Sequence, residues 1–417
     1  MNWKSGAMNQ GHLSEYFDGA GVKILSPVDA EPKSSNQHEI GTTVPMRKFL
    51  GTDKSEFDVT YIWLNDEQET ITDHGFATHY NCREGKPRPP EYRLYYTSNA
   101  VTDIMSAGDT LFLAIRPDET ILFIVVPSDS TIQSQLLWLF GLDDEPQKKF
   151  KFAEFSGDDS KVDFISRFIL DEIGIEFEDP DANSLDTIID RFGLEFPKTA
   201  ELSELARLTL PEVNALDDPD FALTAWLDHE EALFRRLEKK VVAERIQEGF
   251  VNEDDVDVDG FIKYSLSVQN RRKSRMGHSF ENQLKAVFDA FKLRYDSQVI
   301  TEKGKKPDFI FPGKDEYFDP EFNTSRLTML AAKSTCKDRW PQILPEAERI
   351  ETKHLITLEP AISLPQTSLM QESGVQLIVP DSIRGSYSNL QQENIWTIAK
   401  FIDVILHRQK YSSNENI

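Results

Sequence analysis

The chain has 417 residues, of which 39% are hydrophobic and 28% charged, and its formal net charge is −25. This length exceeds what one hydrophobic core normally supports, so we expect two domains in a soluble globular protein. No stretch approaches the roughly 18 apolar residues of a membrane-spanning helix, and residues 1–18 lack a signal-peptide pattern, so we predict a cytoplasmic protein with no membrane partner. The acidic balance excludes a general polyanion binder, because DNA binding depends on Lys and Arg.

The N-terminal part of the chain changes character after about 50 residues. Those first residues are polar, with scattered Gly, Ser and Asn, and we expect a loosely ordered arm. Four runs with turn signals between them then predict strands. They span residues 57–64, 92–97, 110–115 and 121–126. We therefore predict a β-rich domain over residues 1–148.

The C-terminal part alternates between helical and strand patterns. Acidic clusters between residues 143 and 183 predict a linker at 149–192. Leucines at three- to four-residue spacing predict helices between residues 201 and 248. Further patterns predict a helix at 280–291, strands at 308–311, 328–336, 354–358 and 375–379, and a last helix at 395–407. Alternating strands and helices predict an α/β domain over residues 193–417.

One region departs from the acidic average. Between Lys263 and Arg339 there are 16 Lys or Arg residues against 10 Asp or Glu residues. Four basic residues without an acid fall within six positions: Arg271, Arg272, Lys273 and Arg275. Such a cluster favours contact with the DNA backbone, and the alternative is a solvated helix or loop face.

Asp308 and Lys333 are the strongest candidates for catalytic residues. Asp308 follows Pro307 at the start of an apolar strand, and Lys333 lies 25 residues later inside another. A lysine there is costly to bury unless it faces a polar site. Hydrolysis of a phosphodiester uses carboxylates that hold a divalent cation, with an ammonium nearby.

In the commonest PD-(D/E)xK motif an acid stands two residues before the lysine, but here that position is Ala331. A second carboxylate to hold the cation must therefore come from elsewhere. Glu346, in a predicted helical stretch at 342–350, supplies one candidate, and Glu281, on the predicted helix 280–291, supplies another. The alternative makes Asp308 a turn residue and Glu346 an acid that favours the first turn of a helix.

Three longer motifs occur in one order: Ser-Val-Gln-Asn-Arg-Arg-Lys-Ser-Arg from residue 267, Lys-Lys-Pro-Asp-Phe from 305, and Thr-Cys-Lys-Asp-Arg-Trp from 335. Over roughly residues 196–383 the chain resembles the catalytic domain of the EcoRII restriction endonuclease family. The resemblance implies the PD-(D/E)xK restriction-endonuclease-like fold, a central mixed sheet flanked by helices. It also implies Mg²⁺-dependent cleavage of double-stranded DNA by a type II enzyme of a restriction–modification system.

The resemblance further implies roles for individual residues. Asp308, Lys333 and Glu346 would form the active site, with Asp308 and Glu346 holding Mg²⁺ and Glu281 as an auxiliary acid. The family places its second carboxylate on the following helix, which accounts for Ala331. A homodimer would supply two active sites for two strands.

Lys337, Asp338 and Arg339 fall where related enzymes read a CC:GG half-site. The basic groups would donate to guanine O6 and N7, and the aspartate would accept from cytosine N4. The alternative is a surface charge cluster. Relatives also flip the central base pair, and we assign no residue to that step.

The N-terminal domain offers a weaker resemblance. Residues 88–96 and 107–112 resemble the strand–turn–strand pattern of the plant-type DNA-binding pseudobarrel that EcoRII carries at its N-terminus. On that basis Arg83, Lys86, Arg88 and Arg93 are candidate DNA contacts in a sensing or autoinhibitory domain. The alternative is an ordinary β-barrel with basic edge strands. For the whole chain, the rival hypotheses are a modification-dependent endonuclease and a catalytically inactive DNA-binding protein.

Overall fold

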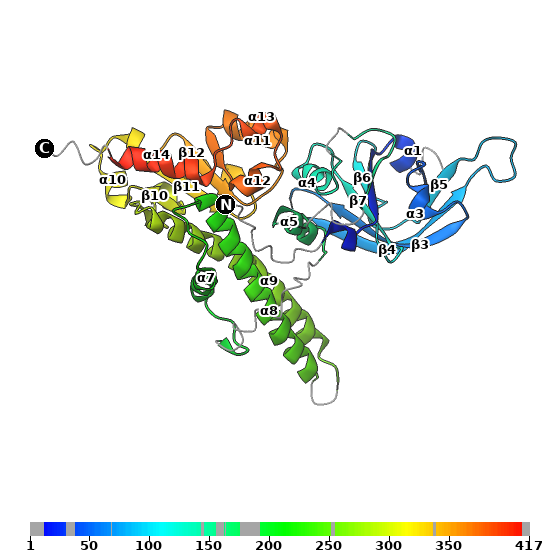
Figure 1. Ribbon diagram of the computed structural model, residues 1–417, viewed down its shortest axis with the longest axis horizontal. Coiled ribbons are helices and arrows are strands. Elements are labelled where there is room, and N and C mark those ends of the chain that lie inside the picture. The colour runs from blue at the N-terminus through cyan, green and yellow to red at the C-terminus, as the bar shows by residue number, and fades with distance from the viewer. Residues whose placement is uncertain are drawn as a thin grey trace, which may run out of the picture. The chain divides into compact units, whose positions relative to one another are not determined.

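The computed structural model describes residues 12–30, 38–67, 69–142, 146–155, 162, 164–175, 192–251, 255–336 and 339–410. The chain divides into two compact units (Figure 1). The first comprises Met1–Glu178 and Ala361–Pro365, and the second comprises Asp179–Pro360 and Gln366–Ile417. Within the described residues, no helix is long and apolar enough to cross a membrane.

The first unit is built on an eight-stranded sheet, which confirms the β-rich character predicted for it. The strand order is β2-β5-β4-β3-β7-β6-β1-β8, and every neighbouring pair is antiparallel except β3 with β7. The strands are β1 (Gly19–Ile24), β2 (Glu39–Gly41), β3 (Ser55–Leu64), β4 (Thr70–Asn81), β5 (Tyr92–Tyr96), β6 (Thr110–Ile115), β7 (Ile121–Val126) and β8 (Lys151–Glu154). β6 and β7 are buried along their whole length, so they form the centre of this unit.

Two segments of the first unit differ from the sequence prediction. β1 lies within the stretch expected to be a loose arm, yet it pairs with both β6 and β8. Its glycines explain this position, because a Cβ atom on Gly19 would lie 2.6 Å from the ring of Phe152 on β8. β8 and α5 (Phe164–Glu172) fall within the predicted linker 149–192, whereas the boundary between the units lies after Glu178. The remaining helices of this unit are α1 (Pro27–Ala30), α3 (Arg47–Leu50) and α4 (Thr131–Leu139).

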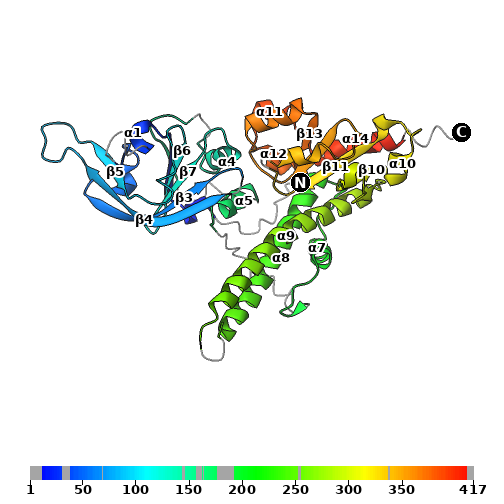
Figure 2. The ribbon, with the colours of Figure 1, turned by 180° about the vertical axis from the view of Figure 1, so that it is seen from behind.

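The second unit begins with a helical layer. Its helices are α7 (Thr199–Leu208), α8 (Pro219–Glu248) and α9 (Val258–Ala290). α8 and α9 run side by side as a long helical hairpin that extends beyond the sheet of this unit (Figures 1 and 2). α9 is much longer than the helix predicted at 280–291, because it also includes the basic segment from Arg271 to Arg275.

The sheet of the second unit has five strands in the order β13-β12-β11-β10-β9. The strands are β9 (Asp296–Ser297), β10 (Phe309–Phe311), β11 (Thr328–Lys333), β12 (Lys353–Thr357) and β13 (Val375–Ile378). β11, β12 and β13 are parallel, whereas β9 and β10 are antiparallel to their neighbours. The expected mixed sheet flanked by helices is therefore confirmed.

Aromatic side chains fix two helices against one face of this sheet. The Phe288 ring of α9 packs on Phe309 and Phe311 of β10, with ring centroids 5.3 and 5.4 Å apart. Phe401, on α14 (Ile398–Lys410), packs on Phe311 and on His354 of β12. The other face of β10 and β11 carries the buried side chains of Ile310, Met329 and Ala331, so polar residues can lie there only at the strand ends. Shorter helices α10 (Lys314–Phe318), α11 (Leu364–Glu372), α12 (Asp381–Arg384) and α13 (Asn389–Gln392) complete the unit.

Candidate active site

Strand alternation brings Asp308 and Lys333 to the same face of the sheet. In the antiparallel register Phe309 lies opposite Leu330 and Ile310 opposite Met329. Side chains alternate along each strand, so Asp308 shares the face of Ile310, and Lys333 shares the face of Met329. That face is the one opposite the Phe288 and Phe401 packing.

The Asp308 carboxylate is held by three donors. Its Oδ2 atom accepts from the Lys333 ammonium at 3.0 Å and from the Ala332 backbone N–H at 2.8 Å. Its Oδ1 atom accepts from the side-chain amide of Gln298 at 3.1 Å. Asp308 is 7% exposed, whereas the Lys333 side chain is 40% exposed, so the ammonium stands at the open side of the pair.

Glu346 reaches the same face from a turn and not from a helix. The 3-10 helix η6 (Trp340–Ile343) ends before it, and Ala347 has a left-handed backbone with φ of 47°. Pro345 explains the difference from the predicted helix 342–350, because proline lacks the N–H that would continue one. The turn is fixed by Lys353, whose ammonium donates to the carbonyls of Glu346 at 2.8 Å and of Ala347 at 2.9 Å. Lys353 lies opposite Met329, on the Asp308 face.

Burial raises the pKa of two carboxyl groups in this cluster, Glu346 and Glu281. It raises the pKa of Glu346 to about 7, an effect opposed by Lys333 and reinforced by Asp308. Burial, together with the charge of Asp308, also raises the pKa of Glu281. Burial therefore disfavours the charged forms of Glu346 and Glu281, and the neighbouring charge of Asp308 adds to this effect.

This donor set fits a divalent cation in its chemistry. The Oε2 atom of Glu346 is buried and has no hydrogen-bond partner among the described residues, and carboxylate oxygens are the ligands that Mg²⁺ prefers. Within the described part of the chain, however, no three His, Cys, Asp or Glu side chains are already arranged as a metal site.

Gln298 is a member of this cluster that sequence reasoning missed. Its amide nitrogen lies 3.1 Å from Asp308 and 3.4 Å from Glu281, and so links the two acids. A single Gln after a two-residue strand carries no recognisable signal in the sequence. Only the pairing of β9 with β10 shows that it faces Asp308.

The predicted base-reading segment is partly described. Lys337 and Asp338 lie outside the described residues. Arg339 is exposed, and Trp340, which follows it, is buried and donates from Nε1 to Gln366 at 2.9 Å. On the other side, the backbone N–H of Cys336 donates to the fully buried Glu359 carboxylate at 3.1 Å. The segment thus has a fixed residue on each flank.

The four basic residues of α9 have different environments. Arg275 is 6% exposed and lies between the helices, with its guanidinium paired to Glu230 and Glu231 of α8. Arg272 pairs with the buried Glu238 at 2.6 Å. Arg271 stacks over Phe196 at 3.9 Å, and Lys273 is exposed. The expectation of a DNA-backbone contact therefore needs correction for Arg275, because a buried and paired guanidinium cannot reach a phosphate in this arrangement.

The candidate DNA contacts of the first unit lie on β5 and on the loop between β4 and β5. Arg83 and Arg93 both pair with Glu91, and Arg93 also pairs with Glu39 at 2.7 Å. These partners raise the pKa of Arg93. Lys86 and Arg88 are exposed on the loop. Two of the four basic groups are thus engaged with acids, and two face solvent.

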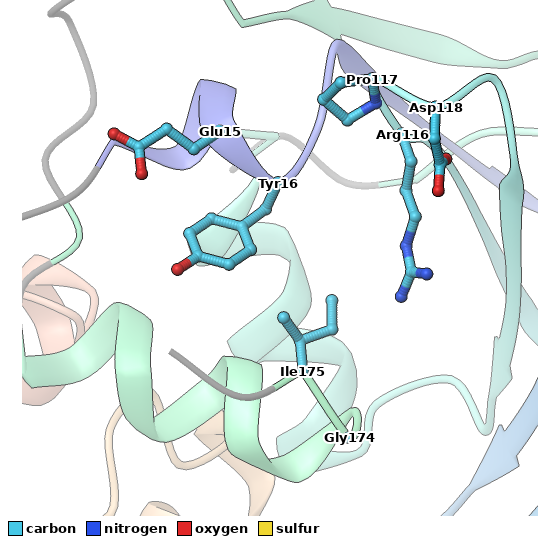
Figure 3. A pocket seen from close by; sticks show the side chains of 7 residues that line it. All are labelled: Glu15, Tyr16, Arg116, Pro117, Asp118, Gly174 and Ile175. Atoms are coloured by element: carbon cyan, nitrogen blue, oxygen red, sulfur yellow. The ribbon is translucent and has the colours of Figure 1, made fainter. Parts of the chain in front are cut away.

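The first unit also contains a cavity of about 420 Å³. In Figure 3 the side chains of Tyr16 and Arg116 face this space, with Ile175 lining it from below. Glu15, Pro117, Asp118 and Gly174 complete its lining. None of the predicted site residues lines it.

Comparison with known proteins agrees with the resemblance described above. Carboxylates and a lysine on one face of a mixed α/β sheet are typical of metal-dependent nucleases. Residues 234–402 match the family model described as EcoRII C terminal, so this part of the chain is similar to the C-terminal domain of that family. The prediction of an EcoRII-like C-terminal region is therefore confirmed.

Two curated relatives are similar to the chain. The type II restriction enzyme EcoRII of Escherichia coli is 40% identical over 230 residues, which are 55% of this chain and 55% of the relative. The type II restriction enzyme SsoII of Shigella sonnei is 26% identical over 165 residues, 37% of this chain and 52% of the relative. The chain thus spans about half the length of the curated relatives it matches.

Solved structures of two restriction enzymes are also similar. Metal-depleted Ecl18kI in complex with uncleaved, modified DNA has 19% identity and a TM-score of 0.44, over 56% of this chain and 86% of that one. The restriction endonuclease PspGI in a substrate DNA complex has 18% identity and a TM-score of 0.43, over 52% and 94%.

Proposed function

We propose that this protein is a type II restriction endonuclease that hydrolyses double-stranded DNA with Mg²⁺ at a CC/GG-containing site. The observation that carries the proposal is the contact between Asp308 and Lys333, with the unpartnered Glu346 oxygen on the same face. The matched EcoRII C-terminal domain, whose residues 234–402 include this cluster, supports it.

In the proposed mechanism Asp308 and Glu346 would hold the cation, and Glu281 would complete or tune its surroundings. Bound Mg²⁺ would offset negative charge on the phosphate during in-line attack of water and departure of the 3′ oxygen. The exposed Lys333 ammonium contacts the scissile phosphate and orients the attacking water. The hydrogen bond from the Lys333 ammonium to Asp308 holds the ammonium at the end of the strand. The lysine side chain therefore loses less conformational freedom when it contacts the phosphate.

DNA recognition is proposed to come from Lys337, Asp338 and Arg339. Arg271, Arg272 and Lys273 remain candidates for the DNA backbone, although Arg272 would have to leave Glu238. We propose a cytoplasmic homodimer that acts in restriction–modification and phage defence, because cutting both strands in one encounter requires two active sites. The first unit is proposed to sense a second DNA element or to restrain cleavage, with the exposed Lys86 and Arg88 as its first contacts.

Asp308→Asn tests the nuclease proposal. The variant keeps the side-chain shape but loses the charge that holds the cation, so Mg²⁺-dependent cleavage of a long natural duplex should fall at least about a hundredfold. Binding of the same DNA without Mg²⁺ should stay within a few-fold of that of the unmodified protein. Asp315→Asn, on the exposed α10, is a matched control that should cut normally. Normal cutting by Asp308→Asn would remove this residue from the chemistry.

Two other hypotheses are distinguished by the same assay. A modification-dependent endonuclease would cut base-modified DNA and spare plain DNA. A catalytically inactive DNA-binding protein would cut neither substrate at any Mg²⁺ concentration. Sequencing the ends of the products would identify the recognition site.

A further inference from the structure

The residue between the two acids, Gln298, has an unusual backbone. Its φ is 56°, in the left-handed region that glycine adopts readily and other residues rarely do. The strand β9 ends immediately before it, and its backbone N–H donates to the carbonyl of Asp308 at 3.1 Å. A glycine would fit this turn with less strain. The presence of a longer side chain at such a position suggests that the side chain has a function.

The side chain of Gln298 has two amide hydrogens and two carboxylates within reach. It lies 3.1 Å from Asp308 Oδ1 and 3.4 Å from Glu281 Oε2. An amide can donate to both anions at once, and it thereby offsets the repulsion between them. Glu281 lies on α9 and Asp308 immediately precedes β10, so the amide connects groups from two separate parts of the unit.

We propose that Gln298 is a positioning residue that holds Asp308 and Glu281 toward one another and thereby sets the affinity of the site for a divalent cation. This inference rests on the proposed nuclease function, which supplies the cation. Gln298 itself need not touch the cation or the DNA. Groups that orient metal ligands in this way change metal affinity by about 10- to 100-fold when they are removed.

Two substitutions separate the amide from the backbone strain. Gln298→Met keeps the strained backbone and a chain of similar length but removes both donors. Gln298→Gly removes the donors and relieves the strain as well. Lys292→Gly is the matched control, because Lys292 is exposed at the end of α9 and has a similar φ of 55° but no bond to either acid.

The first measurement is the melting temperature of the full-length protein as Mn²⁺ or Mg²⁺ is titrated, which reports cation binding without cleavage. Both Gln298 variants should need about tenfold more cation for the half-maximal rise in melting temperature. Without cation, Gln298→Gly should melt at or above the temperature of the unmodified protein, and so should Lys292→Gly. Lys292→Gly should bind cation normally.

The second measurement is the cleavage rate against Mg²⁺ concentration. The Mg²⁺ concentration for half-maximal cleavage should rise about tenfold in both Gln298 variants, while the rate at saturating Mg²⁺ should stay within about threefold. Unchanged cation affinity in both variants, or weaker binding in Gln298→Gly alone, would overturn the proposal. Tighter cation binding in both would also overturn it, because the amide would then compete with the cation. If the unmodified protein does not cut DNA, the nuclease proposal fails, and the melting titration still decides the role of Gln298.

Discussion

Two charged clusters in the second unit show opposite ways of holding ionisable groups. Between α8 and α9, the carboxylates of Glu230 and Glu231 pair with the guanidinium of Arg275, and Glu238 pairs with Arg272. At the ends of β10 and β11, Lys333 is the ammonium paired with Asp308. Glu346 forms no ion pair there within the described residues, and burial raises its pKa to about 7.

The difference indicates which cluster is structural and which is prepared for a ligand. In the helical cluster Arg235 also pairs with Glu231, so three guanidinium groups compensate the charges of the three acids inside the fold. In the strand-end cluster the buried Glu346 carboxylate has no ion-pair partner among the described residues, and a divalent ion would supply that counter-charge. In the sequence both regions are mixtures of acidic and basic residues. Only the ion pairs in the structure distinguish the two clusters.

The largest expected effect comes from breaking the helical cluster. Arg275→Met should lower the free energy of unfolding by about 3–5 kcal/mol, because Glu230, which is fully buried, would lose its counter-charge. Urea denaturation followed by circular dichroism measures this change. Adding Glu230→Gln should recover much of the loss, since the new amide side chain would be neutral and its oxygen could still accept the hydrogen bond from Gln283. A fully stable Arg275→Met variant would show that the cluster is not structural, and the comparison would fail.

His354 tests a third way of burying an ionisable group, which is to leave it neutral. It is 1% exposed on β12, 5.7 Å from the Phe401 ring, and burial lowers its pKa to about 3. The unfolded chain therefore binds a proton below pH 6.5 that the folded chain does not, so stability falls as the pH falls. Between pH 6.5 and 4.5 the protonation of His354 in the unfolded chain should lower the free energy of unfolding by about 2 kcal/mol.

The variant His354→Leu isolates this contribution, because leucine is apolar and does not titrate. The difference in unfolding free energy between the variant and the unmodified protein should shift by about 2 kcal/mol in favour of the variant from pH 6.5 to 4.5. Other acids titrate in both proteins and largely cancel in the difference. A difference that does not change with pH would mean that His354 is already protonated or accessible to water in the folded chain.

The sequence predicted the apolar strands of both units closely, because β6 and β7 are continuous buried runs bounded by turns. It missed β4, whose half-exposed polar residues do not alternate clearly with apolar ones. It also missed β1, where the glycines that read as loop are needed for contact with Phe152. For β1 the deciding information is a set of neighbours far away in the sequence, on β6 and β8.

The candidate site was predictable to a similar degree. Asp308, Lys333 and Glu346 are found on one face, but the turn that carries Glu346 depends on the bonds from Lys353, which no spacing rule reveals. Arg275 illustrates the opposite error. Its place in a basic run favours a surface role, whereas the helix periodicity of α9 turns it toward α8 while Lys273 faces solvent. Residues of one basic run therefore lie in different surroundings on different sides of one helix.

The smallest expected effect belongs to Lys273. As the exposed lysine of the α9 basic run, it is the best placed of the four residues for a DNA phosphate, and Lys273→Ala should weaken binding less than about tenfold for all DNA sequences alike. The slope of log affinity against log salt should fall in magnitude by about 1, because one fewer counterion is released. Fluorescence anisotropy at several salt concentrations, without Mg²⁺, measures both quantities. Lys240→Ala, an exposed lysine on α8, is the matched control for loss of one charge. Equal losses in both variants would assign the effect to overall charge, and the run on α9 would then have no contact of its own with DNA.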